Sequence, residues 1–154
     1  MYIIKLNKKL LCAFAVCAAV VLAAFAGNRI LQGREETIAT AAGVSISLKA
    51  EKEAQRAGFL SAVGHPDMGE PQEVKEVLIP DQFDKTYASY NLLQKRSGFD
   101  LSKYRGKTAV QYRYQNSEKC ITLLVHKGNI IGGDITFVKN SEEMLPLFEK
   151  GQGM

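Results

Sequence analysis

Cys120, His65 and His126 are the residues whose types most readily suggest catalysis. A cysteine and a histidine can act as nucleophile and base when their side chains lie within hydrogen-bond reach. Cys120 and His126 fall in one stretch that reads as a strand, so about 20 Å separates them at roughly 3.3 Å per residue. This excludes a dyad on that strand. His65 reaches Cys120 only if the tertiary fold brings it there, and a lone cysteine in a strand is more often a small core residue.

Metal chemistry has little support in the sequence. The two histidines are far apart, no second cysteine follows Cys120, and no dense carboxylate cluster is present. Structural and catalytic metal sites use compact sets of such ligands. His65 and Asp67 lie in a Gly- and Pro-rich stretch that is typical of an exposed turn. We therefore expect no metal and no cofactor.

Asp100 and Asp134 are the acids with the clearest local contexts. Asp100 lies in a Gly-Phe-Asp-Leu stretch and is placed to form an Asx turn onto Ser102 or Lys103. Asp134 follows two glycines, where freed backbone amides or Arg113 on a neighbouring strand could satisfy its carboxylate. Either acid could serve as a general acid or base. An envelope-acting enzyme that uses Asp134 or Asp100 is therefore one hypothesis.

A series of basic residues is the strongest binding candidate. A loop that folds back on a helix end would present them as one positive surface, with Tyr104 beside them, to anionic envelope polymer, lipid headgroups or a protein partner. The alternative is a solvated face with intramolecular ion pairs. The series consists of Lys95, Arg96, Lys103, Arg105, Lys107 and Arg113.

The net charge of +4 does not indicate a nucleic-acid partner. Three of the 20 Lys and Arg residues precede the first apolar stretch, so 17 remain against 16 Asp and Glu. The remainder of the chain is therefore nearly neutral, whereas nucleic-acid binding needs a concentrated basic footprint.

Residues 10–27 form an uncharged apolar stretch preceded by lysines. A helix of that length can just cross a bilayer, and the lysine excess favours a cytoplasmic N-terminus. Ala24-Phe25-Ala26 followed by Gly27 also fits a signal peptidase site. A retained single-pass anchor is the preferred interpretation and a secreted form cleaved after Ala26 is the alternative. Both place the domain outside the cytoplasm.

The helices and strands that the sequence predicts around these residues indicate an α+β fold. We expect an anchor over 1–27, a stalk over 28–47 and one domain over 48–150, with an antiparallel sheet of about four strands and two or three helices on one face. A phase slip near Gly132-Gly133 predicts a β-bulge. Helices are predicted at Ser47–Val63, Asp81–Arg96 and Ser141–Lys150, and strands at Glu73–Ile79, Thr108–Tyr114, Cys120–His126 and Ile130–Val138.

An aromatic stripe marks the second predicted helix. Phe83, Tyr87, Tyr90 and Leu93 recur at steps of four, three and three, which is the spacing of one helical face. Such a stripe is more often core packing than a ligand platform. We therefore interpret it as the buried face of this helix.

Two phrases carry a resemblance to a known family. The phrase YNLLQKRSGFDLSKYRGK and the later LLVHKGNIIGGDI resemble an uncharacterised family of Gram-positive bacteria, a domain of unknown function found behind a single membrane anchor. The similarity runs from about Arg56 to Phe137. It implies an anchored extracytoplasmic domain and assigns no catalytic residue. A non-enzymatic binding or interaction module of the cell envelope is thus the expected function.

The anchor and signal-peptide interpretations predict different mature proteins. A retained anchor leaves residues 10–27 in the membrane-bound chain, because no peptidase has acted at Ala26. Mass spectrometry of the N-terminal peptide from washed membranes should therefore recover sequence upstream of Gly27. A mature chain that begins at Gly27 would contradict the anchor.

Overall fold

The computed structural model describes residues 36–39 and 43–150. The predicted anchor, the predicted cleavage point at Ala26 and most of the predicted stalk lie outside these residues. Within the described part of the chain, no helix is both long and apolar enough to cross a membrane.

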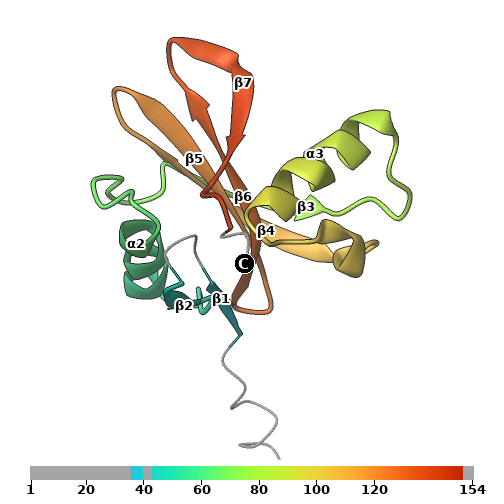
Figure 1. The fold of residues 1–154 in the computed structure, drawn as a ribbon, viewed down its shortest axis with the longest axis horizontal. Coiled ribbons are helices and arrows are strands. Elements are labelled where there is room, and N and C mark those ends of the chain that lie inside the picture. The colour runs from blue at the N-terminus through green and yellow to red at the C-terminus, as the bar shows by residue number, and fades with distance from the viewer. Residues whose placement is uncertain (1–35, 40–42, 151–154) are drawn as a thin grey trace, which may run out of the picture. The chain divides into compact units, whose positions relative to one another are not determined.

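The core of the domain is an antiparallel sheet of five strands in the order β3-β4-β5-β6-β7 (Figure 1). Each strand pairs with its neighbour in sequence. The predicted α+β class and antiparallel sheet are confirmed, with five strands where about four were expected. The strands are β3 (Glu73–Leu78), β4 (Thr108–Gln115), β5 (Lys119–His126), β6 (Asn129–Phe137) and β7 (Asn140–Pro146).

The fifth strand replaces a predicted helix. Residues Asn140–Pro146 pair with β6, so the prediction of a helix over Ser141–Lys150 is wrong. Pro146 explains the difference, because inside a helix it would remove a hydrogen bond and clash with the preceding turn, whereas an edge strand accepts it. Leu147 then packs into the core.

The two helices cover opposite faces of the sheet, contrary to the expectation of one covered face (Figure 1). Helix α2 (Glu53–Ala62) packs its Phe59 and Leu60 with Ile121 and Leu123 of β5. We call this side the α2 face. Helix α3 (Lys85–Arg96) covers the other side, where the three aromatic residues of the predicted stripe are half-buried against the cluster that contains Leu124 of β5. The buried residues of α3 are instead Asn91 and Gln94. We call this side the α3 face.

The folded unit begins earlier than predicted. Strands β1 (Thr37–Ala39) and β2 (Ser45–Ser47) form a hairpin, and their Ile38 and Ile46 lie in the core of the α2 face. The chain divides at Glu36, so the hairpin belongs to the domain and not to the stalk predicted over 28–47.

The N-cap of α2 is Lys52, so the helix starts later than the predicted range Ser47–Val63. Residues 48–50 instead extend along the start of β6: Ile130 N–H donates to the Leu48 carbonyl, and Ala50 N–H donates to Gly128. Gln55 then accepts a hydrogen bond from the Lys52 backbone at the true N-terminus. Extended pairing with the sheet therefore outweighs local helix propensity here.

Helix α3 is fixed at both ends. Its N-cap is Asp84, which accepts a hydrogen bond from Tyr87 N–H at 2.7 Å, so the helix starts later than the predicted range Asp81–Arg96. Near its C-terminus, the fully buried Gln94 accepts a hydrogen bond from Gly133 N–H of β6 at 2.8 Å. The helix is thereby held directly against the sheet backbone.

The predicted β-bulge is present one residue before the glycine pair. Leu124 pairs with Gly132 and Val125 with Ile130, so Ile131 is the extra residue. Ile130 and Ile135 then both face the α2 core although five positions separate them. A side chain at Gly132 would meet Gln94, and one at Gly133 would meet Thr122 and Leu147. The two glycines therefore permit close packing on both faces.

Gly133→Ala should destabilise the domain by about 2 kcal/mol, because overpacking a filled core has a cost of this order. The added Cβ would overlap the Thr122 carbonyl and lie 2.5 Å from Leu147 Cδ1. Urea unfolding followed by circular dichroism measures the change.

Gly58→Ala is the matched control. Gly58 lies inside α2 with nothing within 4 Å of an added Cβ, so alanine should stabilise by about 0.5 to 1 kcal/mol through helix propensity. Equal effects of the two substitutions would contradict the packing around Gly133.

Candidate functional site

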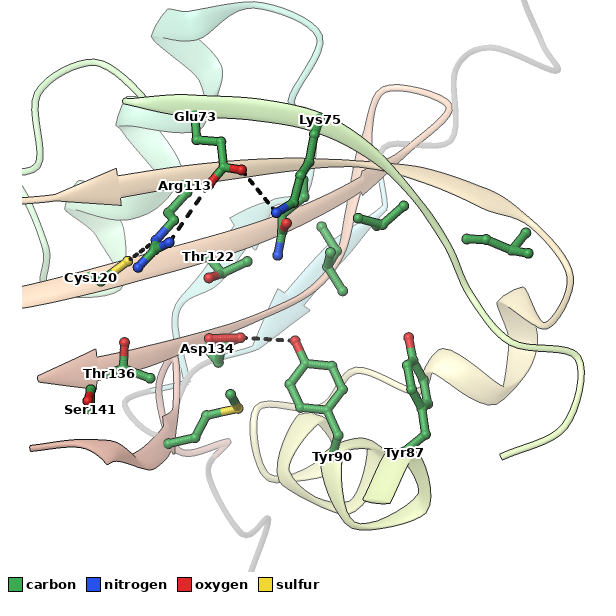
Figure 2. Close-up of a pocket in the computed structure, with 15 residues that line it drawn as sticks. Glu73, Lys75, Tyr87, Tyr90, Arg113, Cys120, Thr122, Asp134, Thr136 and Ser141 are labelled. Atoms are coloured by element: carbon green, nitrogen blue, oxygen red, sulfur yellow. Dashed lines mark hydrogen bonds and ion pairs between the residues drawn. The ribbon is translucent and has the colours of Figure 1, made fainter. Parts of the chain in front are cut away.

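A cleft opens on the α3 face, beside the N-terminal part of α3 (Figure 2). Its volume is about 480 Å³, within the range of small-molecule sites. Strands β3 to β6 form its floor, and Tyr87 and Tyr90 of α3 form a wall. Its other polar lining residues are Glu73, Lys75, Gln111, Arg113, Cys120, Thr122, Asp134, Thr136 and Ser141.

Four polar residues cross the floor of the cleft in one line. The strand register pairs Glu73 with Arg113, Arg113 with Thr122, and Thr122 with Asp134. Residues directly opposite in antiparallel strands point to the same face, so all four side chains point toward the cleft. We call Glu73, Arg113, Thr122 and Asp134 the polar row.

Asp134 is the buried end of the polar row. Its exposed fraction is 5%, and the Tyr90 hydroxyl donates a hydrogen bond to its Oδ1 at 3.0 Å (Figure 2). Burial raises the pKa of Asp134 from 3.8 to about 6, although the hydroxyls of Tyr90 and Thr122 and the charge of Arg113 offset part of this effect. Burial and the Asp134 charge also raise the pKa of Tyr90.

No ion pair compensates Asp134 among residues 36–39 and 43–150. A buried carboxylate without a cation is costly to ionise, which is why its pKa rises. A perturbed acid that lines a cleft is a candidate functional residue.

The other end of the polar row is solvated and carries excess positive charge. Glu73 accepts from Lys75 at 3.0 Å and lies 3.7 Å from Arg113. Two cations thus share one carboxylate, and the Lys75 and Arg113 side chains are 51% and 49% exposed. Arg113 Nε also donates to the Cys120 thiol at 2.9 Å. The cleft is therefore dipolar, negative beside Tyr90 and positive beside β3.

The six predicted basic residues do not all share one site. Arg113 lines the cleft, and none of the other five does. Lys95 pairs with Asp100 at 3.7 Å, and Arg96 pairs with Glu149. These two pairs agree with the alternative of a face with intramolecular ion pairs.

Lys103, Arg105 and Lys107 lie together around the 3₁₀-helix η1 (Leu101–Tyr104). Lys107 donates to the Lys103 carbonyl and lies 5.5 Å from the centre of the Tyr104 ring. Arg105 lies over Phe83 at 4.6 Å. These three residues therefore form a small exposed basic surface.

Asp100 has a structural role. Its Oδ1 accepts hydrogen bonds from the Ser102 backbone, the Ser102 hydroxyl and the buried Asn91. These bonds, together with the charge of Lys95, lower its pKa to about 2. The predicted Asx turn onto Ser102 is therefore present. An acid held in its ionised form in this way is a poor proton donor near neutral pH.

The cysteine and the histidines have separate partners. His126 Nδ1 contacts the Thr108 carbonyl at 2.7 Å, whereas Cys120 contacts Arg113. His65 accepts from Lys119 at Nδ1 and donates from Nε2 to the Leu147 carbonyl, so both of its ring nitrogens are engaged. Across the described residues, no group of three His, Cys, Asp or Glu side chains is arranged to hold a metal ion.

Sequence reasoning found Asp134 and Arg113 but missed their neighbours. Tyr90 was assigned to the core, where its ring does pack, while its hydroxyl reaches Asp134. Thr122 lies inside a largely apolar strand and is not among the predicted site residues. The Thr122 hydroxyl lies on the same face of the sheet as Gln111 and Arg113 of the preceding strand. Together they predict a polar patch once the strand register is known.

Comparisons of the chain with protein-family models, curated proteins and solved structures found no match. The resemblance to a Gram-positive family behind a membrane anchor therefore stays a prediction.

Asp134→Asn should stabilise the domain at pH 8 and lose this advantage at pH 4. The folded-state pKa of Asp134 is about 6 against an ordinary 3.8, so between these values the folded chain binds a proton that the unfolded chain releases. The stability that the Asp134 carboxyl contributes is fully present below about pH 3.8 and is lost as the pH rises through 6. The loss is on the order of 3 kcal/mol.

Urea unfolding of both proteins between pH 4 and pH 8 measures this difference. His65 and Asp100 titrate in both proteins, so the comparison isolates Asp134. A variant that is equally stabilised at both pH values would show that burial does not perturb the Asp134 carboxyl.

Proposed function

We propose that this chain is a membrane-anchored, non-enzymatic binding domain of the cell envelope that holds its ligand in the cleft beside α3. The observation that carries the proposal is the dipolar polar row. Asp134 is buried and has no counter-ion among residues 36–39 and 43–150, and it lies opposite the exposed, excess cations Arg113 and Lys75. Such an arrangement lowers stability by itself, and a complementary ligand would compensate it.

The spacing of the acids supports binding over hydrolysis. Paired-carboxylate hydrolysis of glycosides uses two acids about 5 to 10 Å apart. Glu73 and Asp134 are three strands apart, or about 14 Å between their backbones at the usual strand spacing. Asp100 is engaged in its own turn. Glu73 is the other acid of the described residues that lines the cleft, so Asp134 has no partner acid there at a catalytic distance.

The proposed location rests on the N-terminal sequence. The uncharged stretch over 10–27 follows Lys5, Lys8 and Lys9, a pattern that anchors a chain with its N-terminus inside. The resemblance to an anchored Gram-positive family points the same way. A domain outside the membrane would meet envelope polymers, lipid headgroups and the exposed parts of other proteins.

The basic surface of Lys103, Arg105 and Lys107 is a second candidate binding site. Its support is the grouping of three exposed cations around Tyr104 and Phe83. An anionic polymer or an acidic lipid headgroup would suit it. Charge reversal at Arg105 and Lys107 would abolish such binding without lowering thermal stability.

An enzyme that uses Asp134 as general acid is the remaining alternative. Its support is the pKa of about 6, which suits proton transfer near neutral pH. If Asp134 is catalytic, the wild-type chain should release product from envelope material and Asp134→Asn should not. Equal release of product by the two proteins would exclude this enzymatic function.

Binding in the cleft predicts a bound mass that depends on Arg113. The full chain, expressed in a Gram-positive host and extracted gently from its membranes, should carry an additional mass in native mass spectrometry. Arg113→Gln should remove that mass, because it deletes a cation of the cleft. The variant Arg105→Glu, Lys107→Glu should retain it. A mass lost only in the charge-reversed variant, or no bound mass, would contradict the cleft.

A further inference from the structure

We infer that the cleft binds a short zwitterionic peptide of two or three residues, with its terminal ammonium on Asp134 and its terminal carboxylate on Arg113 and Lys75. This inference rests on the proposed binding function and names the ligand class.

The Asp134 end is built to accept hydrogen bonds from an ammonium group. Tyr90 donates its proton to Asp134, so the Tyr90 oxygen keeps its lone pairs for another donor. The Thr122 hydroxyl is the next group along the polar row. An ammonium carries three donors and one positive charge. It matches this set of oxygens and supplies the counter-ion that Asp134 lacks within the described part of the chain.

The opposite end suits a carboxylate. Arg113 and Lys75 share the single carboxylate of Glu73, which leaves one positive charge without an ion-pair partner of its own among the described residues. The Arg113 guanidinium uses Nε on Cys120 and NH1 on Glu73, so its remaining N–H groups can donate to a ligand. Arginine binds carboxylates in a planar, charge-assisted geometry.

The distance between the two ends sets the length of the ligand. Arg113 and Asp134 are two strands apart, which is about 10 Å between their backbones. An extended chain advances about 3.5 Å per residue. In a single α-amino acid the ammonium and the carboxylate are attached to the same carbon, so it is too short. Two or three residues span the distance between the two ends of the cleft.

Other ligand classes match the cleft less well. A neutral sugar would leave Asp134 and the excess cation uncompensated, and a polyanion would be repelled by Asp134. Leu124, Val77 and Met144 provide apolar lining beside the charges, which suits small apolar side chains. The volume of about 480 Å³ accommodates a peptide of this size.

The test is a titration of the full chain in detergent with trialanine at pH 7.5, followed by calorimetry. N-acetyl-trialanine, which lacks the ammonium, and trialanine amide, which lacks the carboxylate, are the matched ligands. We expect trialanine to bind, and each blocked peptide to bind about 10-fold more weakly or worse, because each loses a charge-assisted pair.

Cleft variants make the assignment of each end specific. Asp134→Asn should weaken the binding of trialanine by a similar factor and leave the binding of N-acetyl-trialanine unchanged. Arg113→Gln should likewise weaken the binding of trialanine and leave the binding of trialanine amide unchanged. Such non-additivity identifies the interacting pair. The control Lys139→Gln changes an exposed cation outside the cleft and should bind trialanine like wild type.

Three outcomes would overturn the inference. One is the absence of trialanine binding at millimolar concentration, and another is an Asp134→Asn effect that is equal for free and acetylated peptides. The third is binding to phosphatidylethanolamine vesicles without binding to peptide. If an Arg113-dependent mass is nevertheless present in native mass spectrometry, the binding function stands and only the ligand class is wrong.

Discussion

The architecture depends on one constraint: the central strand β5 is buried on both sides. Its six inner residues are all buried, so the sheet needs a cover on each face. The β1–β2 hairpin and α2 cover one face, and α3 covers the other. With 12 residues, α3 is about 18 Å long and lies over the part of β5 that carries Leu124. The rest of that face, around Cys120 and Thr122, is left as the floor of the cleft.

The elements with a strong local pattern could be predicted, and those set by tertiary pairing could not. The alternation of β4 and the aromatic spacing of α3 were sufficient to place both elements. Residues 48–50 and β7 were misassigned because their backbone hydrogen bonds go to β6, a partner that local propensity does not reveal. For the site, Asp134 and Arg113 were candidates from sequence, but their alignment with Thr122 and Tyr90 requires the register and the helix position.

Asp134 shows a conflict between stability and use. Replacing a buried, uncompensated carboxyl with a neutral side chain generally favours the folded state, and such groups are typical of sites where a protein gives up stability for recognition or chemistry. Asp100 is the opposite case in the same molecule. Its three hydrogen bonds stabilise the ionised form and fix the loop after α3, so two acids that looked alike in sequence lie in opposite environments.

The bulge in β6 decides which side of the sheet carries the negative charge. Side chains alternate along a strand, so with regular pairing from Ile130 onward Asp134 would lie on the same face as Ile130, among the apolar residues beneath α2. The extra residue Ile131 reverses the alternation and turns Asp134 toward α3. A single inserted residue thus moves this acid from the apolar core beneath α2 to the floor of the cleft. The number of residues in β6 therefore determines the polarity of the cleft as much as the identity of any side chain does.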